Sequence, residues 1–111
     1  MSDLKTKHCQ ACEGFTEPMS RADAERGLGQ LDSHWGIDEA GRSIQRGFKF
    51  KNFHETMAFV NAVAWIAHVE DHHPDMAVGY NRCSVQFSTH AVGGLTENDL
   101  ICAARIDALF D

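Results

Sequence analysis

The sequence predicts an α+β domain in which a four-stranded antiparallel sheet has its helices packed on one face. Two pairs of segments with alternating apolar residues, each pair joined by a short turn, indicate two β-hairpins. Three segments with helical apolar spacing lie before, between and after these hairpins. The predicted order is therefore α-β-β-α-β-β-α, which is typical of an antiparallel sheet with helices on one side.

The chain of 111 residues is long enough for one domain and too short for two. We expect this domain at residues 20–111, preceded by a flexible N-terminal arm at residues 1–19, which is polar and contains Gly14 and Pro18. The formal net charge of −6 argues against a nucleic-acid partner. The N-terminus lacks the apolar region of a secretory signal, and the longest apolar run, residues 57–67, is too short to span a membrane. These features favour a cytoplasmic protein without nucleic-acid or membrane partners.

The first half of the chain contains a helix and a hairpin. Ser20 followed by Asp23 is a weak N-cap signal, and the helix is expected to continue to about Leu31. Strands are predicted near residues 34–38 and 43–50, because apolar side chains recur at alternate positions of the second segment.

A long central helix is predicted over residues 53–71. Asn52 is expected to cap it, with Glu55 completing a capping box. One apolar stripe of this helix consists of Phe53, Met57, Val60, Ala64 and Ala67, and it is widened by Phe59, Val63 and Ile66. Because this surface is wide for a small protein, we expect the helix to pack on the sheet and against a second subunit. Pro74 ends the helix, since the residue before a proline is disfavoured in the helical region.

The second hairpin and the last helix complete the domain. The hairpin is expected to turn near Asn81-Arg82, and alternating apolar residues mark its second strand: Cys83, Val85 and Phe87. Thr96 and Asp99 have the spacing of a capping box, which predicts a final helix over residues 97–110.

Four cysteines in a chain without a secretory signal favour reduced thiols over a disulfide framework. Cys83 and Cys102 fall within apolar patterns and are interpreted as small core residues. His8, Cys9 and Cys12 have the spacing of half a zinc site, but no second Cys/His pair follows at the spacing of a zinc finger. We therefore interpret this stretch as part of the arm, carrying two thiols, and expect no bound metal.

Histidines gather at the end of the central helix. His68 and His72 lie four residues apart, a spacing that metal ligands use, but the HExxH pattern is absent. His72 closes the helix and His73 occupies an extended step before Pro74, so their imidazoles should diverge. The helix C-terminus and the neighbouring acids should favour the protonated form of His72. His90 follows the second hairpin and could return toward this helix end, where histidines can donate and accept protons near neutral pH.

Three spaced motifs are more specific than any single histidine. They are Asp71-His72-His73-Pro74, then Tyr80-Asn81, then Thr89-His90 followed by Gly94-Leu95-Thr96 and Asp99. This combination resembles the pterin-4a-carbinolamine dehydratase family over about residues 20–110. The resemblance implies dehydration of 4a-hydroxytetrahydrobiopterin to quinonoid dihydropterin and water, which recycles the cofactor of aromatic amino acid hydroxylases. It also implies that the pterin is the substrate and that the reaction needs no other cofactor and no metal.

The resemblance further implies three catalytic histidines, which are His72, His73 and His90 in this chain. We hypothesise that His72 is the general acid, His90 the partner that moves protons and His73 a positioning group for the pterin. Candidate substrate-binding residues are Asp71, Pro74, Thr89, Asp99 and His68, although Asp99 is also a candidate helix cap. His68 and Met76 depart from animal members of the family, which have glutamate and tryptophan at these positions.

The partners expected from the resemblance are the pterin substrate, a second copy of the chain in a homodimer or homotetramer, and functional coupling to an aromatic amino acid hydroxylase. An alternative from another class is a protein-interaction or transcriptional co-regulator role through the apolar helix at residues 53–67, which would not require the histidines. A third interpretation, a small histidine and cysteine metal protein, predicts zinc in the purified protein.

Overall fold

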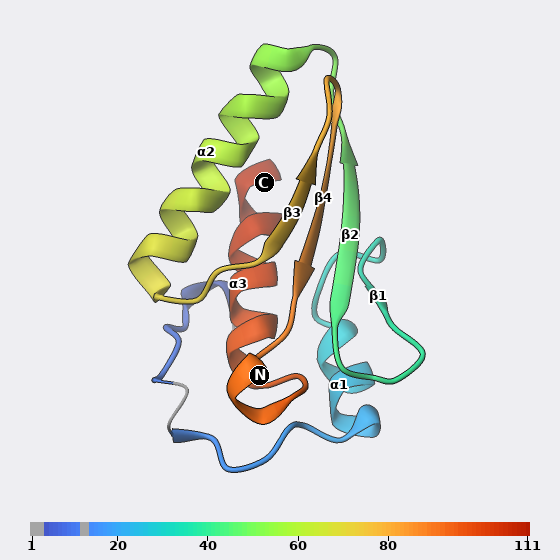
Figure 1. Ribbon diagram of the computed structural model, residues 1–111, viewed down its shortest axis with the longest axis vertical. Coiled ribbons are helices and arrows are strands. Elements are labelled where there is room, and N and C mark those ends of the chain that lie inside the picture. Colours follow the sequence, from blue (N-terminus) through green and yellow to red (C-terminus); the bar gives the residue numbers. More distant parts are fainter. Residues whose placement is uncertain (1–3, 12–13) are drawn as a thin grey trace.

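The computed structural model describes residues 4–11 and 14–111. Its helices within these residues are α1 (Arg21–Leu28), α2 (Phe53–Glu70) and α3 (Glu97–Asp107). The strands are β1 (Gly36–Ile37), β2 (Ile44–Lys49), β3 (Asp75–Val78) and β4 (Arg82–Phe87), and the short 3₁₀ turns are Leu4–Thr6, His90–Val92 and Ala108–Phe110. The predicted α-β-β-α-β-β-α order is confirmed. In Figure 1, α2 and α3 lie beside each other along the sheet.

The described strands form one antiparallel sheet in the order β1-β2-β4-β3. In the central pair, Ile44 is opposite Phe87 and Phe48 is opposite Cys83. These four side chains are buried against the helices, whereas Ser84 and Gln86, which alternate with the buried residues of β4, are exposed. This alternation places one apolar face of the sheet under the helices, as the sequence predicts.

The first hairpin is shorter than predicted. The amide of Trp35 donates to the carbonyl of Asp32, so the chain is still in a turn at that point. On the other side, the Asp38 carboxylate accepts the amides of Arg42 and Ser43 and organises the hairpin turn. Residues 36 and 37 are therefore the part of the first segment that pairs as a strand.

Two predicted helix ends also differ from the structure. The first helix ends at Leu28 and not near Leu31, because the amides of Gly29 and Gln30 donate to carbonyls three residues earlier, in tight turns. The last helix is α-helical only to Asp107, and residues 108–110 continue as a 3₁₀ turn. Neither difference changes the order of the elements.

The buried face of α2 does not coincide with the predicted apolar stripe. The prediction of this stripe was therefore wrong in part. Phe53 remains 47% exposed, and Ala64 is also exposed. The residues that α2 buries are Thr56, Phe59, Val63 and Glu70. Two of these are polar, and both have partners: the Thr56 hydroxyl donates to the Tyr80 carbonyl, and the Glu70 carboxylate accepts from the N-terminal segment. Apolar spacing alone could not locate this face. Packing of α2 against a second subunit stays a prediction.

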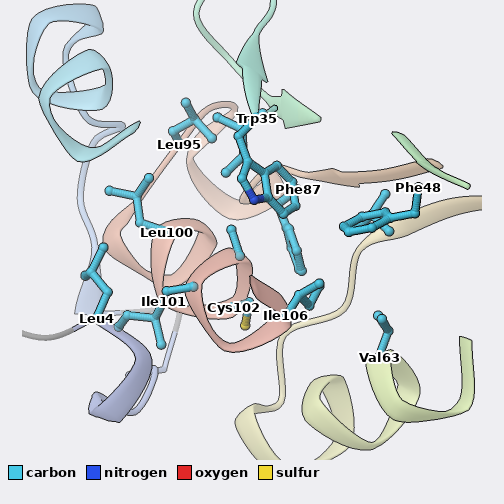
Figure 2. Close-up of a cluster of buried hydrophobic side chains, with 14 of the residues drawn as sticks. Leu4, Trp35, Phe48, Val63, Phe87, Leu95, Leu100, Ile101, Cys102 and Ile106 are labelled. Atoms are coloured by element: carbon cyan, nitrogen blue, oxygen red, sulfur yellow. The ribbon is translucent and has the colours of Figure 1, made fainter. Parts of the chain in front are cut away.

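The core lies between the sheet and the helices α2 and α3 (Figure 2). Trp35 packs against Phe87, and its indole N–H donates to Asp107 at 2.8 Å. Leu4 also enters this core, so residues 4–11 lie against α3. These contacts show where residues 4–11 lie. The mobility expected of residues 1–19 stays a prediction.

Candidate active site

The end of α2 turns His72 into the protein. Asp71 adopts a left-handed conformation with φ of 53°, and the amide of His72 still donates to the Ala67 carbonyl. The His72 side chain is only 7% exposed, and its Nε2 atom lies 2.6 Å from Oδ1 of Asp99. Its ring is parallel to that of Phe87, with an angle of 8° and a centroid distance of 6.0 Å. The imidazole is therefore held at one edge by the hydrogen bond to Asp99 and on one face by the Phe87 ring.

Asp99 is 0% exposed and connects His72 to the start of α3. Its Oδ2 atom accepts the hydroxyl of Thr89 at 2.8 Å and the backbone amide of Thr96 at 2.9 Å. The Thr89 and Thr96 hydroxyl oxygens lie 2.8 Å apart. Asp99 thus caps α3 and holds His72 with the same carboxylate, one oxygen for each task. A buried carboxylate with this set of donors is well satisfied.

The hydrogen bond to Asp99 selects one tautomer of His72. An ionised carboxylate only accepts, so Nε2 of the imidazole carries the hydrogen. The Nδ1 atom has no protein partner among the described residues, which leaves it as the nitrogen that can exchange a proton with a substrate.

The other two histidines lie beside this network and are exposed. His73 follows His72 directly and starts the extended segment that leads through Pro74 into β3. His90 follows Thr89 and begins the 3₁₀ turn His90–Val92. Both segments lie at the end of the molecule where α2 finishes (Figure 1).

The predicted substrate-binding residues divide into two groups. Thr89 and Asp99 are buried and bonded to each other, whereas Asp71 is exposed and Pro74 half-buried at the helix end. His68 is also exposed, and its ring packs against that of Trp65 on α2, with centroids 5.3 Å apart. No hydrogen bond within the described residues joins His68 to the His72 network.

Sequence reasoning missed two neighbours of His72. Phe87 was interpreted only as a core residue of β4, yet its ring stacks on the imidazole. Cys102 was interpreted as a core residue of α3, and its thiol points toward the His72 carbonyl at 3.8 Å. The alternation of β4 and the helical spacing of α3 place both residues inward, but neither pattern identifies a histidine as the contact.

Two cavities of the structure lie away from these histidines. One, of about 630 Å³, lies where Arg46 and Asp107 meet the last residues of the chain. The other, of about 570 Å³, lies over Phe48 of β2 and over Phe50, which follows that strand. The described residues contain no group of three His, Cys, Asp or Glu side chains arranged to hold a metal ion. Cys12, part of the half zinc site considered above, lies outside the described residues.

None of the helices in the described part of the chain is long and apolar enough to cross a membrane.

Comparison with known proteins bears on the same fold and residues. The family model of pterin 4 alpha carbinolamine dehydratase matches residues 17–109. Proteins of Legionella pneumophila (strain Paris) and Nitrosospira multiformis, both named provisionally as pterin-4-alpha-carbinolamine dehydratases, are each 56% identical to this chain. The alignment with the Legionella protein covers 97% of this chain and 96% of the relative, and that with the Nitrosospira protein covers 99% and 95%.

Two solved structures are similar to this chain in fold. A Brucella melitensis protein described as a transcriptional coactivator/pterin dehydratase superposes with a TM-score of 0.79 and 32% identity, covering 84% of this chain and 98% of its own. A pterin dehydratase-like RuBisCO assembly factor of the alpha-carboxysome shares the fold, with a TM-score of 0.59, 24% identity, and coverage of 68% and 87%. The matched residues include the His72–Asp99 network and both exposed histidines, and the chain belongs to the pterin 4 alpha carbinolamine dehydratase family.

Proposed function

We propose that this protein is a hydro-lyase that dehydrates 4a-hydroxytetrahydrobiopterin to quinonoid dihydropterin and water. The observation that carries the proposal is the His72 imidazole, buried between the Asp99 carboxylate and the Phe87 ring and followed directly by the exposed His73. Membership of the dehydratase family supports the same reaction.

In the proposed reaction, His72 acts as the general acid. The buried Asp99 carboxylate lies 2.6 Å from Nε2 and holds the ring in place, so that Nδ1–H is the group that protonates the 4a-hydroxyl. The C4a–O bond then breaks and water leaves. His90 takes the proton from N5, and the N5 electron pair forms the C4a–N5 double bond. Proton exchange with solvent returns both histidines to their starting states.

The remaining residues would bind or position the pterin. His73 is exposed beside His72 and can hydrogen-bond a polar edge of the substrate, and Asp71 and Pro74 lie at the same surface. Thr89 and Asp99 are buried, so we assign them to positioning of His72 and not to direct contact. His68 packs on Trp65, and we place it at the outer wall of the site.

The proposal extends to the biological setting. The substrate would come from aromatic amino acid hydroxylases in the cytoplasm, and dehydration would recycle their cofactor through functional coupling to those enzymes. The pterin is the substrate, and the proposed steps use only side chains of this protein. We also propose a homodimer or homotetramer, which the exposed apolar side chains of α2, Trp65 and Val69, support.

A second candidate function is a protein-interaction or co-regulator role through α2. Trp65 is 66% exposed on this helix, and the Brucella relative is described as a transcriptional coactivator as well as a dehydratase. A Trp65→Ala variant should retain dehydration and lose the interaction, whereas His72→Ala should do the opposite.

The enzymatic proposal is tested with chemically generated 4a-hydroxytetrahydropterin in a stopped-flow spectrometer. The purified protein should accelerate dehydration in proportion to its concentration, and His54→Ala, which replaces an exposed histidine at the other end of α2, should be equally active. A rate equal to that of the spontaneous reaction would exclude the enzymatic function.

A further inference from the structure

The thiols of Cys9 and Cys102 meet where the N-terminal segment, residues 4–11, lies on α3. Their sulfur atoms are 3.6 Å apart, although the residues are separated by 93 positions. Cys102 is 0% exposed and lies among the buried side chains of α3 in Figure 2, whereas Cys9 is partly exposed. Cys9 is therefore the cysteine of the pair that lies nearer to solvent, and Cys102 is buried behind it.

Specific hydrogen bonds hold Cys9 in this place. Its amide donates to Oε1 of the buried Glu70 carboxylate at 2.7 Å. The next residue, Gln10, makes a reciprocal pair with Asn98: its amide donates to the Asn98 side-chain oxygen at 3.1 Å, and its carbonyl accepts the Asn98 amide nitrogen at 2.8 Å. These hydrogen bonds fix the backbone at Cys9 and at Gln10. They therefore hold the Cys9 side chain in contact with Cys102.

Each of the two thiols also lies near a backbone carbonyl oxygen. The Cys9 thiol lies 3.6 Å from the Asn98 carbonyl, and the Cys102 thiol lies 3.8 Å from the His72 carbonyl. Contact with Cys9 and burial both raise the pKa of the Cys102 thiol, which keeps it protonated and unreactive toward solvent. An oxidant would therefore meet Cys9 first.

We propose that Cys9 and Cys102 form an oxidation site at which a peroxide converts the two thiols into an intramolecular disulfide. The Cys9 sulfur attacks one oxygen of hydrogen peroxide, the O–O bond breaks, and the products are a sulfenic acid and water. The Cys102 sulfur then attacks the Cys9 sulfur, the S–O bond breaks, and hydroxide leaves with the Cys102 proton as a second water. The thiols lose two electrons and the peroxide gains them.

The disulfide would attach the N-terminal segment covalently to α3 and close a loop spanning 93 positions. A cross-link of this length restricts the unfolded chain strongly and so stabilises the folded protein. It would also remove the thiol hydrogen that points toward the His72 carbonyl. The oxidation chemistry is independent of the proposed dehydration, because it is detected by mass and by stability.

The test treats the reduced full-length protein with hydrogen peroxide, blocks the remaining thiols and maps the peptides of a non-reducing digest. Wild type, Cys12→Ser and the buried-cysteine control Cys83→Ser should each give a linked peptide pair containing Cys9 and Cys102, and Cys9→Ser should not. The melting temperature of oxidised wild type should rise by about 5 °C or more and return after reduction with dithiothreitol.

Several results would overturn the proposal. A bridge between Cys9 and Cys12 would show that the arm pairs its own cysteines. Oxidation of Cys9 to the sulfinic acid without a bridge would show that Cys102 cannot reach it. Zinc that co-purifies with the protein and protects both thiols would show that the sulfurs meet as metal ligands. A linked pair that fails to raise the melting temperature would show that the bond distorts the fold, so that the two sulfurs are not positioned to form a disulfide.

Discussion

The Nε2 atom of His72 lies 2.6 Å from Oδ1 of Asp99, and both side chains are almost completely buried. The two residues are 27 positions apart, one following α2 and the other in the first turn of α3. This contact joins the end of one helix to the start of another and fixes the orientation of the imidazole that we propose as the general acid.

Replacing Asp99 with asparagine tests how the carboxylate acts on His72. The amide group can still cap α3 through its oxygen, but its NH₂ group then faces Nε2 and cannot accept the imidazole hydrogen. The kcat of Asp99→Asn should therefore fall about 10-fold to 100-fold, with KM little changed. An Asp99→Asn variant that melts at a lower temperature but keeps the wild-type kcat would show that the carboxylate has only a structural role.

The Thr89 hydroxyl should contribute to stability through the same network. Thr89→Val keeps the side-chain shape but removes the donor to Asp99 and the contact with Thr96. We expect the free energy of unfolding in urea to fall by about 1–3 kcal/mol. Ser88→Ala, which removes a hydroxyl bonded to the Arg42 carbonyl at the surface, is the control and should change it by less than about 0.5 kcal/mol. Equal effects of the two variants would contradict this account.

Glu70 should make stability depend on pH in the acidic range. Burial raises the pKa of Glu70, but the Cys9 amide, the His8 imidazole and the Arg105 guanidinium outweigh it and bring the pKa below its usual value. A carboxyl with a depressed pKa stabilises the fold above the unfolded-state pKa and loses this contribution as pH falls through the folded-state pKa. Glu70→Gln should therefore be less stable than wild type at pH 7 by about 1–3 kcal/mol, and the difference should shrink below about pH 4.

The measurement is urea unfolding of both proteins across the acidic range. Glu17→Gln, which changes an exposed carboxyl, should follow the wild-type curve. A stability difference for Glu70→Gln that stays constant down to about pH 3 would show that the charge of Glu70 does not contribute.

Gly27 should resist substitution because α1 packs closely on α3. A Cβ atom at this position would overlap the Leu100 side chain, whereas one at Gly47 on β2 would meet no neighbour. Alanine favours helices, but overpacking of the core costs more than that gain. Gly27→Ala should lower the free energy of unfolding by about 1–3 kcal/mol. A neutral or stabilising Gly27→Ala, with Gly47→Ala unchanged, would show that the two helices separate easily.

The order of elements could be predicted because capping residues and apolar alternation are local signals. Asn52 and Thr96 cap the helices that the sequence predicts, and the alternation over residues 83–87 marks the buried face of β4. The buried face of α2 could not be predicted in the same way. It includes Thr56 and Glu70, which are buried only because other segments of the chain provide their hydrogen-bond partners.

The candidate site was predictable as a set of residues but not as an arrangement. The resemblance named His72, Asp99 and Thr89, and the structure joins them in one network. The inward turn of His72 depends on the left-handed conformation of Asp71. Because aspartate adopts this conformation only occasionally, no local sequence pattern predicts the turn. The stacking of Phe87 on His72 likewise depends on how β4 meets the helix end.

The central claim is that the buried His72, and not its exposed neighbour His73, is the proton donor. Turnover of 4a-hydroxytetrahydropterin by His72→Ala and His73→Ala, measured side by side, tests it most directly. We predict that His72→Ala lowers kcat by about 100-fold or more, whereas His73→Ala chiefly raises KM, because it removes a binding contact. Near-wild-type turnover by His72→Ala together with loss of turnover in His73→Ala would contradict the account.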